Sequence, residues 1–242
     1  MPRRKEQFIV GDVYHVILRA LDDNLLFKDI NDYYRGIFSI YELNNSNPVT
    51  IQKRREARAR FKKQVSRARG STFSANLLEI DERDRFVDIL AFCFMPNHVH
   101  LLLKQIKDNG ISKFIQKVGG GYGRYLNDKY ERKGHIFQDS FRSVHIEGDD
   151  QFMTVVSYIF TNPIALIEPG WKEHGIRNHS SKETIKFLEE YKWSSYQDCI
   201  GIKNFSSVTQ RDFLLETMDG KNGLTGAVKD WIGNKVDIAK HT

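Results

Sequence analysis

The feature that most constrains this chain is an apolar hairpin near its middle. Phe86 to Met95 is a strongly apolar run, Pro96-Asn97 is a turn signal, and His98 to Lys104 is a second apolar run. Two such runs joined by a tight turn are typical of antiparallel strands. The sequence therefore predicts a β-hairpin as the centre of the fold.

Segments on both sides of this hairpin alternate between strand and helix patterns. Strands are predicted at Val13 to Arg19 and Arg142 to Glu147, and helices at Asp29 to Leu43, Ile111 to Tyr130 and Asp149 to Leu166. We expect the last helix to end near Asn162, because Pro163 disfavours helical geometry in the residue before it. The order predicts an α+β fold, a ferredoxin-like split βαβ antiparallel sheet with helices on one face.

Two segments lie outside this pattern. A basic insertion at about residues 50–72 contains Lys53 to Arg69, in which Glu56 is the sole acid, and we interpret it as an exposed helix or a mobile arm. The composition changes again after residue 170, and a helix is predicted at Lys182 to Tyr191. We therefore expect a main domain at 1–170 and a partly helical C-terminal extension at 171–242.

Composition limits the partner and the location. The net charge is +6, which favours a polyanionic partner without proving one. Two cysteines are too few for a disulfide scaffold or a cysteine-rich zinc site. No apolar stretch approaches the roughly 20 residues of a bilayer span, and the charged start lacks a signal-peptide pattern. We expect no membrane partner and a cytoplasmic location, with the choice between monomer and homodimer left open.

His98 and His100 are the first candidate site residues. Strand side chains alternate between faces, so both imidazoles project to one side while Val99 and Leu101 point to the other. Two neutral imidazoles on one face can chelate a metal. The alternative is a pair of histidines with ordinary structural hydrogen bonds, and the pattern by itself leaves both interpretations open.

Tyr158 and Asn162 are the second pair. They are four residues apart on a predicted helix, so they share a face. A phenol and an amide oxygen so placed could offer a nucleophile beside a metal ligand. Alternatively, Tyr158 packs in the core and Asn162 caps the helix end. Tyr122 and Tyr125, on the preceding helix, are rival nucleophiles or core residues.

Four motifs in order resemble one family. Phe94-Met-Pro-Asn-His-Val-His-Leu-Leu-Leu103 comes first, followed by Gly134-His-Ile-Phe-Gln-Asp-Ser-Phe-Arg142. Tyr158-Ile-Phe-Thr-Asn-Pro163 and Tyr191-Lys-Trp-Ser-Ser-Tyr196 complete the set. In this order they resemble the REP-associated tyrosine transposases, within the single-tyrosine HUH (IS200-like) transposases. Any one of them alone would be a weak signal.

The resemblance implies a role for each motif residue. Residues 1–170 would form an HUH catalytic domain in which His98, His100 and Asn162 hold Mg²⁺ or Mn²⁺. Tyr158 would attack a phosphate of single-stranded hairpin DNA and form a 5′-phosphotyrosine. Two alternatives remain: a module that binds DNA or RNA hairpins without cleaving them, and a nuclease in which metal-bound water attacks.

Contacts to DNA phosphates are expected from the basic insertion. Lysine and arginine neutralise phosphate charge, so binding should weaken steeply with salt. The alternative is a solvated charged helix without a ligand. The candidates are Arg54, Arg55, Arg58, Arg60, Lys62, Lys63, Arg67 and Arg69.

Overall fold

The computed structural model describes residues 7–48, 81, 83–138 and 140–240. Its strands are β1 (Val13–Arg19), β2 (Val87–Met95), β3 (His98–Gln105) and β4 (Arg142–His145). The helices of the first part are η1 (Leu21–Asp23), α1 (Ile30–Glu42), α3 (Gly110–Lys129), α4 (Asp149–Thr161) and η2 (Asn162–Leu166). They are followed by α5 (Trp171–His174), α6 (Ser181–Glu190), α7 (Tyr196–Cys199), α8 (Asp212–Thr217) and α9 (Gly220–Lys240). The basic insertion at about 50–72 lies outside the described residues.

The four strands form one antiparallel sheet in the order β2-β3-β1-β4. With α1 between β1 and β2, and α3 between β3 and β4, this order is the split βαβ arrangement. The predicted α+β class, the antiparallel sheet and the central hairpin are confirmed. The register pairs Met95 with His98 across the turn, so the two histidines follow the turn directly.

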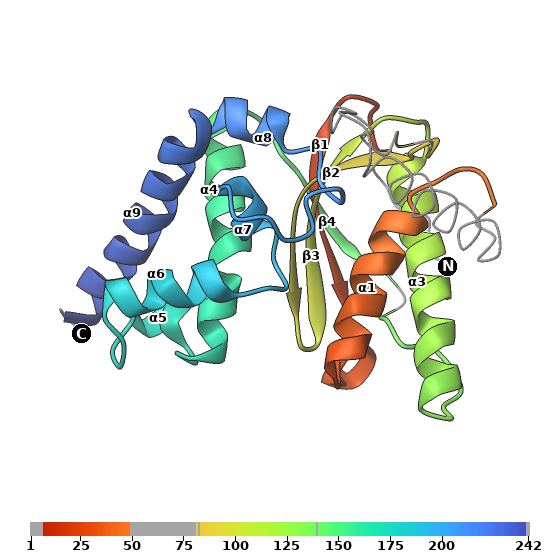
Figure 1. The fold of residues 1–242 in the computed structure, drawn as a ribbon, viewed down its shortest axis with the longest axis horizontal. Helices are drawn as coiled ribbons and strands as arrows, with labels where there is room; N and C mark the ends of the chain where they lie inside the picture. The colour runs from red at the N-terminus through yellow and green to blue at the C-terminus, as the bar shows by residue number, and fades with distance from the viewer. Residues whose placement is uncertain (1–6, 49–80, 82, 139, 241–242) are drawn as a thin grey trace, which may run out of the picture.

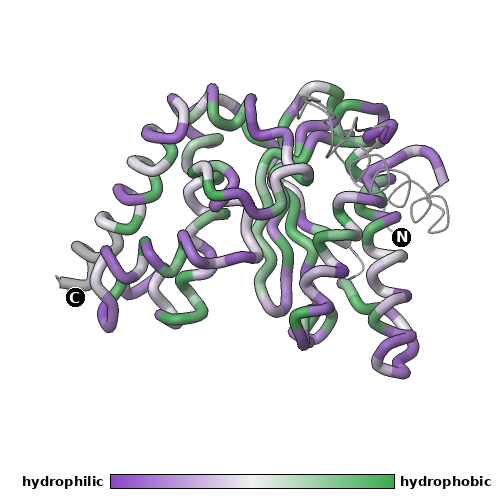
Figure 2. Tube along the Cα trace, viewed as in Figure 1, coloured by the Kyte–Doolittle hydropathy of each residue, from purple (hydrophilic) through white to green (hydrophobic). Residues whose placement is uncertain are grey.

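Helices cover both faces of this sheet (Figure 1), which corrects the expectation of helices on one face. One apolar core contains Val99 and Leu101 from β3 and lies under α1 and α3. A second core contains Leu102 and Cys93 and lies under α4 and the helices that follow. β2 and the middle of β3 are largely hydrophobic in Figure 2 because both of their faces are buried. The run from Phe86 to Met95 is apolar for the same reason.

Local signals in the sequence set the ends of the helices. Asp29 caps α1 by accepting hydrogen bonds from the backbone N–H groups of Asn31 and Asp32. α4 ends at Thr161, and Pro163 lies in the 3₁₀ turn that follows, as predicted from the proline.

Residues after 170 pack against the rest of the chain. The backbone N–H of Phe94 donates to the carbonyl of Trp193 (2.8 Å), which adds a short extended segment beside the edge strand β2. The hydroxyl of Ser195 accepts from the backbone N–H of Phe92 (2.9 Å). α9 lies against α4 and shares its apolar core. Within the described ranges, no helix combines the length and apolarity of a membrane span.

The glycine triplet 119–121 lies inside α3, which runs through it without a break. A Cβ on Gly121 would come within 2.7 Å of Leu43 Cδ1, so this position allows α3 to approach the end of α1 closely. Gly119 and Gly120 line a cavity of about 720 Å³ between α3 and the segment at 134–138. The triplet therefore serves close packing and an open surface rather than a helix break.

Two helical glycines give opposite expected effects on stability. A Cβ on Gly36 would lie 2.5 Å from Phe94 Cε2 and 2.8 Å from Phe27 Cε1, inside a packed core. We expect Gly36→Ala to lower the free energy of unfolding by about 1–3 kcal/mol. A Cβ on Gly120 would meet nothing within 4 Å. Gly120→Ala should therefore raise the free energy of unfolding by about 0.5–1 kcal/mol. Urea unfolding of both variants is the check; a stabilised Gly36→Ala protein would contradict this packing.

Candidate active site

His98 and His100 lie side by side on the same face of β3. Their ring centroids are 4.8 Å apart. Because the strand alternates, both rings face α4, on the opposite side of the sheet from Val99 and Leu101. His98 is half-buried, and its Nδ1 donates a hydrogen bond to Asn97 Oδ1 (2.7 Å). This bond fixes the proton on Nδ1 and leaves the lone pair on Nε2, the tautomer that a metal ligand needs.

A third histidine, which the sequence analysis missed, completes the cluster. His15, on the adjacent strand β1, places its Nε2 2.9 Å from Nδ1 of His100. The two rings stack with centroids 5.1 Å apart. The hydrogen bond occupies Nδ1 of His100, while Nε2 of His100 is buried and has no hydrogen bond of good geometry in the part of the chain described, although the Asn162 side chain interacts with this ring. A buried, unpaired ring nitrogen is costly unless something binds it.

All three imidazoles are held in the neutral form. Burial, aided by the charge of Lys172, lowers the pKa of His15 to about 4. Burial also lowers the pKa of His98 to about 4, with Arg19 and Lys172 contributing and Asp23 opposing. The pKa of His100 is well below its ordinary value, chiefly through burial. With Nδ1 of His100 donating to Nε2 of His15, His98 and His100 each keep an Nε2 lone pair that can bind a cation without first losing a proton.

Tyr158 and Asn162 reach this cluster from α4 and the turn that follows it. The half-buried Tyr158 ring lies edge-on to the rings of His100 and His15, with centroids 5.5 Å and 5.9 Å away. Asn162 is 2% exposed, and its Nδ2 donates to the backbone carbonyl of Tyr158 (2.7 Å). This bond caps the helix end, as the structural alternative expected. It also leaves Oδ1 of the amide to face another group.

That group is Lys172, a second residue that the sequence analysis missed. Its Nζ donates to Asn162 Oδ1 (2.9 Å) and lies 4.1 Å from the centroid of the Tyr158 ring. Lys172 is on α5, at the start of the C-terminal extension, and no motif or periodicity marks it. The structure thus brings together His98, His100, Tyr158 and Asn162, and adds His15 and Lys172 to them.

The donor set fits a divalent cation in chemical type. It contains two neutral imidazoles, one with an unpaired buried nitrogen, and an amide oxygen. Imidazole and amide groups are ordinary ligands of Mn²⁺ and related metals. No cluster of three or more His, Cys, Asp or Glu suited to a metal occurs among the residues described. A third protein donor in this set would be the amide oxygen of Asn162.

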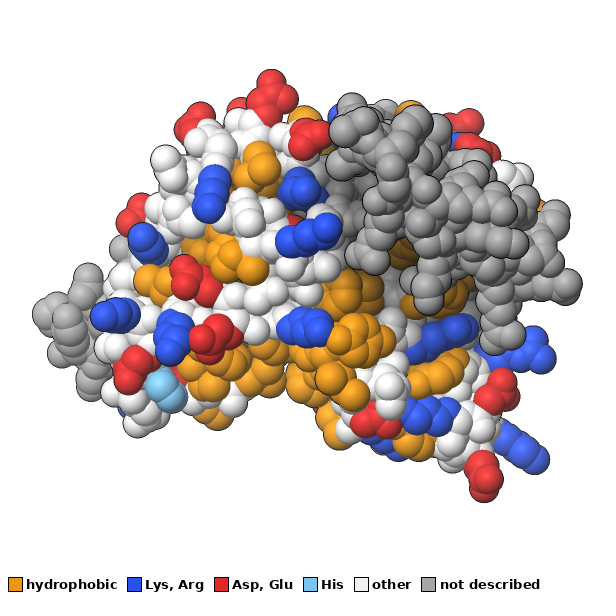
Figure 3. Space-filling view, viewed as in Figure 1, with side chains coloured by type: hydrophobic (Ala, Val, Ile, Leu, Met, Phe, Trp, Pro, Cys, Tyr) orange, Lys and Arg blue, Asp and Glu red, His pale blue; other side chains and the backbone are white. Residues whose placement is uncertain are grey.

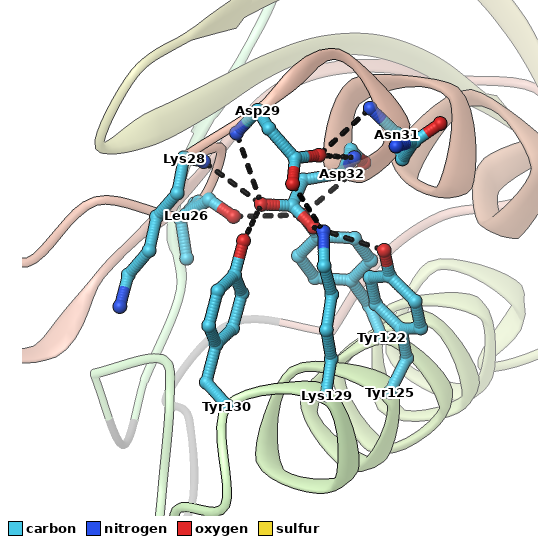
Figure 4. Close-up of polar contacts among 9 residues, drawn as sticks. All are labelled: Leu26, Lys28, Asp29, Asn31, Asp32, Tyr122, Tyr125, Lys129 and Tyr130. Carbon is cyan, nitrogen blue, oxygen red and sulfur yellow. Dashed lines mark hydrogen bonds and ion pairs between the residues drawn. The ribbon is translucent and has the colours of Figure 1, made fainter.

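The rival tyrosines belong to a different cluster (Figure 4). The Tyr122 hydroxyl donates to the carbonyl of Leu26 (2.7 Å), and the Tyr125 hydroxyl donates to Asp32 Oδ1 (2.9 Å). Burial, together with the charge of Asp32, raises the pKa of both phenols. Both side chains pack into the core under α1 and α3, on the opposite face of the sheet from His100. Their contacts are those of structural residues.

None of the eight basic candidates between Arg54 and Arg69 lies among the described residues. On the face drawn in Figure 3, the lysines and arginines that are described are interspersed with acidic and hydrophobic side chains. The described surface in this view thus has no continuous basic stripe that could take their place. Their role in binding DNA stays a prediction.

The fold is an α+β sheet whose central strand carries the histidine pair opposite a helix carrying a tyrosine. The sequence was compared with models of protein families. Residues 47–162 match the model described as "Transposase IS200 like". These residues are thus similar to the IS200-like transposases, the family that the ordered motifs resemble.

One similar solved structure is that of a REP-associated tyrosine transposase bound to a REP hairpin. The sequence identity is 13%, and the TM-score is 0.48. The match covers 85% of this chain and 90% of the other. A comparison with curated protein sequences gives no match.

Proposed function

We propose that this transposase nicks and joins single-stranded hairpin DNA, with Tyr158 as the nucleophile. The observation that carries the proposal is the convergence of His98, His100, Tyr158 and Asn162 on one face of the sheet. The ring of Tyr158 lies 5.5 Å from that of His100, centroid to centroid. A nucleophile beside a cluster of metal-ligand groups is what metal-assisted phosphoryl transfer requires.

Each residue has a part in the reaction. His98, His100 and Asn162 would hold Mg²⁺ or Mn²⁺, which when bound supplies Lewis-acid stabilisation of charge on the phosphate. The Tyr158 oxygen attacks the phosphorus as its phenol loses a proton. A bond forms between this oxygen and phosphorus, the bond to the 3′ oxygen breaks, and a free 3′-hydroxyl leaves. The protein then carries the downstream strand as a 5′-phosphotyrosine, a polarity that follows from the family resemblance.

His15 and Asn97 would act as positioning residues. Each lies within hydrogen-bond distance of Nδ1 of one histidine of the pair, His15 at His100 and Asn97 at His98. Partners of this kind orient metal-binding imidazoles and set their tautomer. The sequence analysis found the pair itself but not these supports.

Residues 1–170 would form the catalytic domain, with 171–242 as an extension that supplies Lys172. The basic insertion would bind the DNA backbone. A cytoplasmic location and the choice between monomer and homodimer stay predictions.

The test is a search for a covalent protein–DNA adduct. We expect single-stranded hairpin DNA, incubated with the protein and Mn²⁺ and labelled at its 3′ end, to migrate with the protein on a denaturing gel. DNA labelled at its 5′ end should instead give a free shorter fragment. A chelator should remove both products, because the phosphate would lose its Lewis acid.

The other outcomes separate the alternatives. Cleavage without any adduct would contradict the tyrosine mechanism and favour attack by water. Binding without cleavage in Mg²⁺ or Mn²⁺ would favour a module that only grips hairpins.

A further inference from the structure

We propose that the ammonium group of Lys172 is an internal cation that competes with the divalent metal for the amide oxygen of Asn162. On this proposal, the metal gains its full set of ligands only when DNA phosphate draws Lys172 away. The inference rests on the proposed function and adds to it a coupling between metal loading and DNA binding.

The contacts of Lys172 are the first support. Its Nζ lies 2.9 Å from Asn162 Oδ1, the atom that would ligate the metal. The other polar atom of that amide, Nδ2, is held by the backbone carbonyl of Tyr158. The amide therefore cannot offer Oδ1 to a metal by turning over without breaking that bond. The metal and Lys172 would therefore compete for the same oxygen atom.

Electrostatics is the second support. The Nζ of Lys172 lies 2.9 Å from Asn162 Oδ1 and 4.1 Å from the centroid of the Tyr158 ring, which lies edge-on to His100 and His15. An ammonium group at this position must repel a divalent ion bound by His98, His100 and Asn162. Because the cluster is largely buried, water and salt screen this repulsion less than they would at the surface.

The position of Lys172 in the chain lets it move. It lies in the four-residue helix α5, which is bounded by Gly170 (φ +77°) and Gly175 (φ +74°). Its neighbour Trp171 is 1% exposed and anchors the segment in the core. The half-buried lysine has a flexible four-carbon stem, so its charge can swing to a phosphate while the helix stays in place.

The experiment measures Mn²⁺ affinity without DNA, by electron paramagnetic resonance of the free ion. We expect Lys172→Met to bind Mn²⁺ about tenfold more tightly than the wild type, since competition and repulsion are both removed. Lys172→Gln, which keeps a polar side chain, should also tighten binding at least threefold. The control is Lys182→Met, an exposed lysine on α6 with the same charge change, and its affinity should stay within twofold of the wild type.

A second variant separates the specific contact from general repulsion. In an Asn162→Ala protein there is no shared oxygen. The increase in Mn²⁺ affinity caused by Lys172→Met should therefore be less than half of the increase seen when Asn162 is present.

Hairpin DNA added to a Tyr158→Phe protein, which cannot form the adduct, should raise Mn²⁺ affinity. The same DNA should have little effect on the Tyr158→Phe protein that also carries Lys172→Met.

Failure of this inference differs from failure of the proposed function. If Mn²⁺ binds and requires His98 and His100, but Lys172→Met leaves its affinity unchanged, the competition is wrong and the proposed function stands. If Lys172→Met raised Mn²⁺ affinity equally with and without Asn162, competition for the shared oxygen would also be wrong. If Mn²⁺ binds none of these proteins, the metal site and the inference both fail.

Discussion

Replacement of Tyr158 by phenylalanine should lower the yield of the covalent DNA adduct by about 10³-fold or more, because no other group can take over the attack. The change removes one oxygen from a half-buried ring that packs edge-on against His15 and His100. The shape of the site is kept, so binding of hairpin DNA should stay within about twofold of the wild type. A denaturing gel and a binding titration on the same preparation measure the two effects.

Tyr125→Phe is the matched control. It also removes a phenol oxygen from the chain, but from the Asp32 cluster on the other side of the sheet. We expect its adduct yield to stay within about threefold of the wild type at temperatures where it is folded. An adduct that survives in Tyr158→Phe and is lost in Tyr125→Phe would reverse the assignment of the nucleophile.

Replacement of Asp32 by alanine should cost about 3 kcal/mol of folding free energy, a large part of the stability of a typical domain. The Asp32 side chain is completely buried at the start of α1 and joins it to the end of α3 (Figure 4). Its carboxylate accepts from Lys129 Nζ (2.6 Å) and from the hydroxyls of Tyr125 (2.9 Å) and Tyr130 (2.7 Å). Alanine would leave the two phenol hydroxyls without this acceptor and Lys129 with Asp29 as its remaining carboxylate partner. Urea unfolding at neutral pH measures the loss.

The loss of folding free energy in Asp32→Ala should also depend on pH. Burial alone would raise the pKa of Asp32, but Lys129, Tyr130, the backbone of Lys28 and Tyr125 outweigh it, and the pKa is lowered. A folded-state pKa below the unfolded value, which is about 4, stabilises the protein above that pH. This contribution is lost as the pH falls through the folded pKa. The difference between wild type and Asp32→Ala should therefore narrow in acid.

Asp128→Ala serves as the control for Asp32→Ala. Asp128 lies on the same helix as Lys129 but is exposed, and removal of its charge should change stability by less than about 0.5 kcal/mol. Equal effects of the two substitutions would contradict the role given to the buried carboxylate.

The local pattern of this sequence was enough to predict its elements. β1 was predicted at its observed bounds, α1 followed from apolar residues at helical spacing, and the end of α4 followed from a proline. Spacing placed His98 with His100 on one strand face and Tyr158 with Asn162 on one helix face, but it left their roles open, and the resemblance to the transposase family singled them out. Rules of this kind need no knowledge of the tertiary structure.

Contacts between residues far apart in the sequence could not be predicted by such rules. His15 joins the site because β1 lies next to β3 in one register, and Lys172 joins it because α5 folds back beside Asn162. Neither contact is marked by a regular spacing of residues in the sequence. The second layer of helices was also missed, because helices were expected on one face of the sheet although both faces of β2 and β3 are buried.

The most direct test of the central claim is to identify the residue that carries the DNA. The adduct formed with Mn²⁺ would be digested with nuclease and protease, and the peptides mapped by mass spectrometry. This account predicts a nucleotide phosphate on the peptide that contains Tyr158, attached to that tyrosine. A phosphate found instead on Tyr122, Tyr125 or any other residue would contradict it.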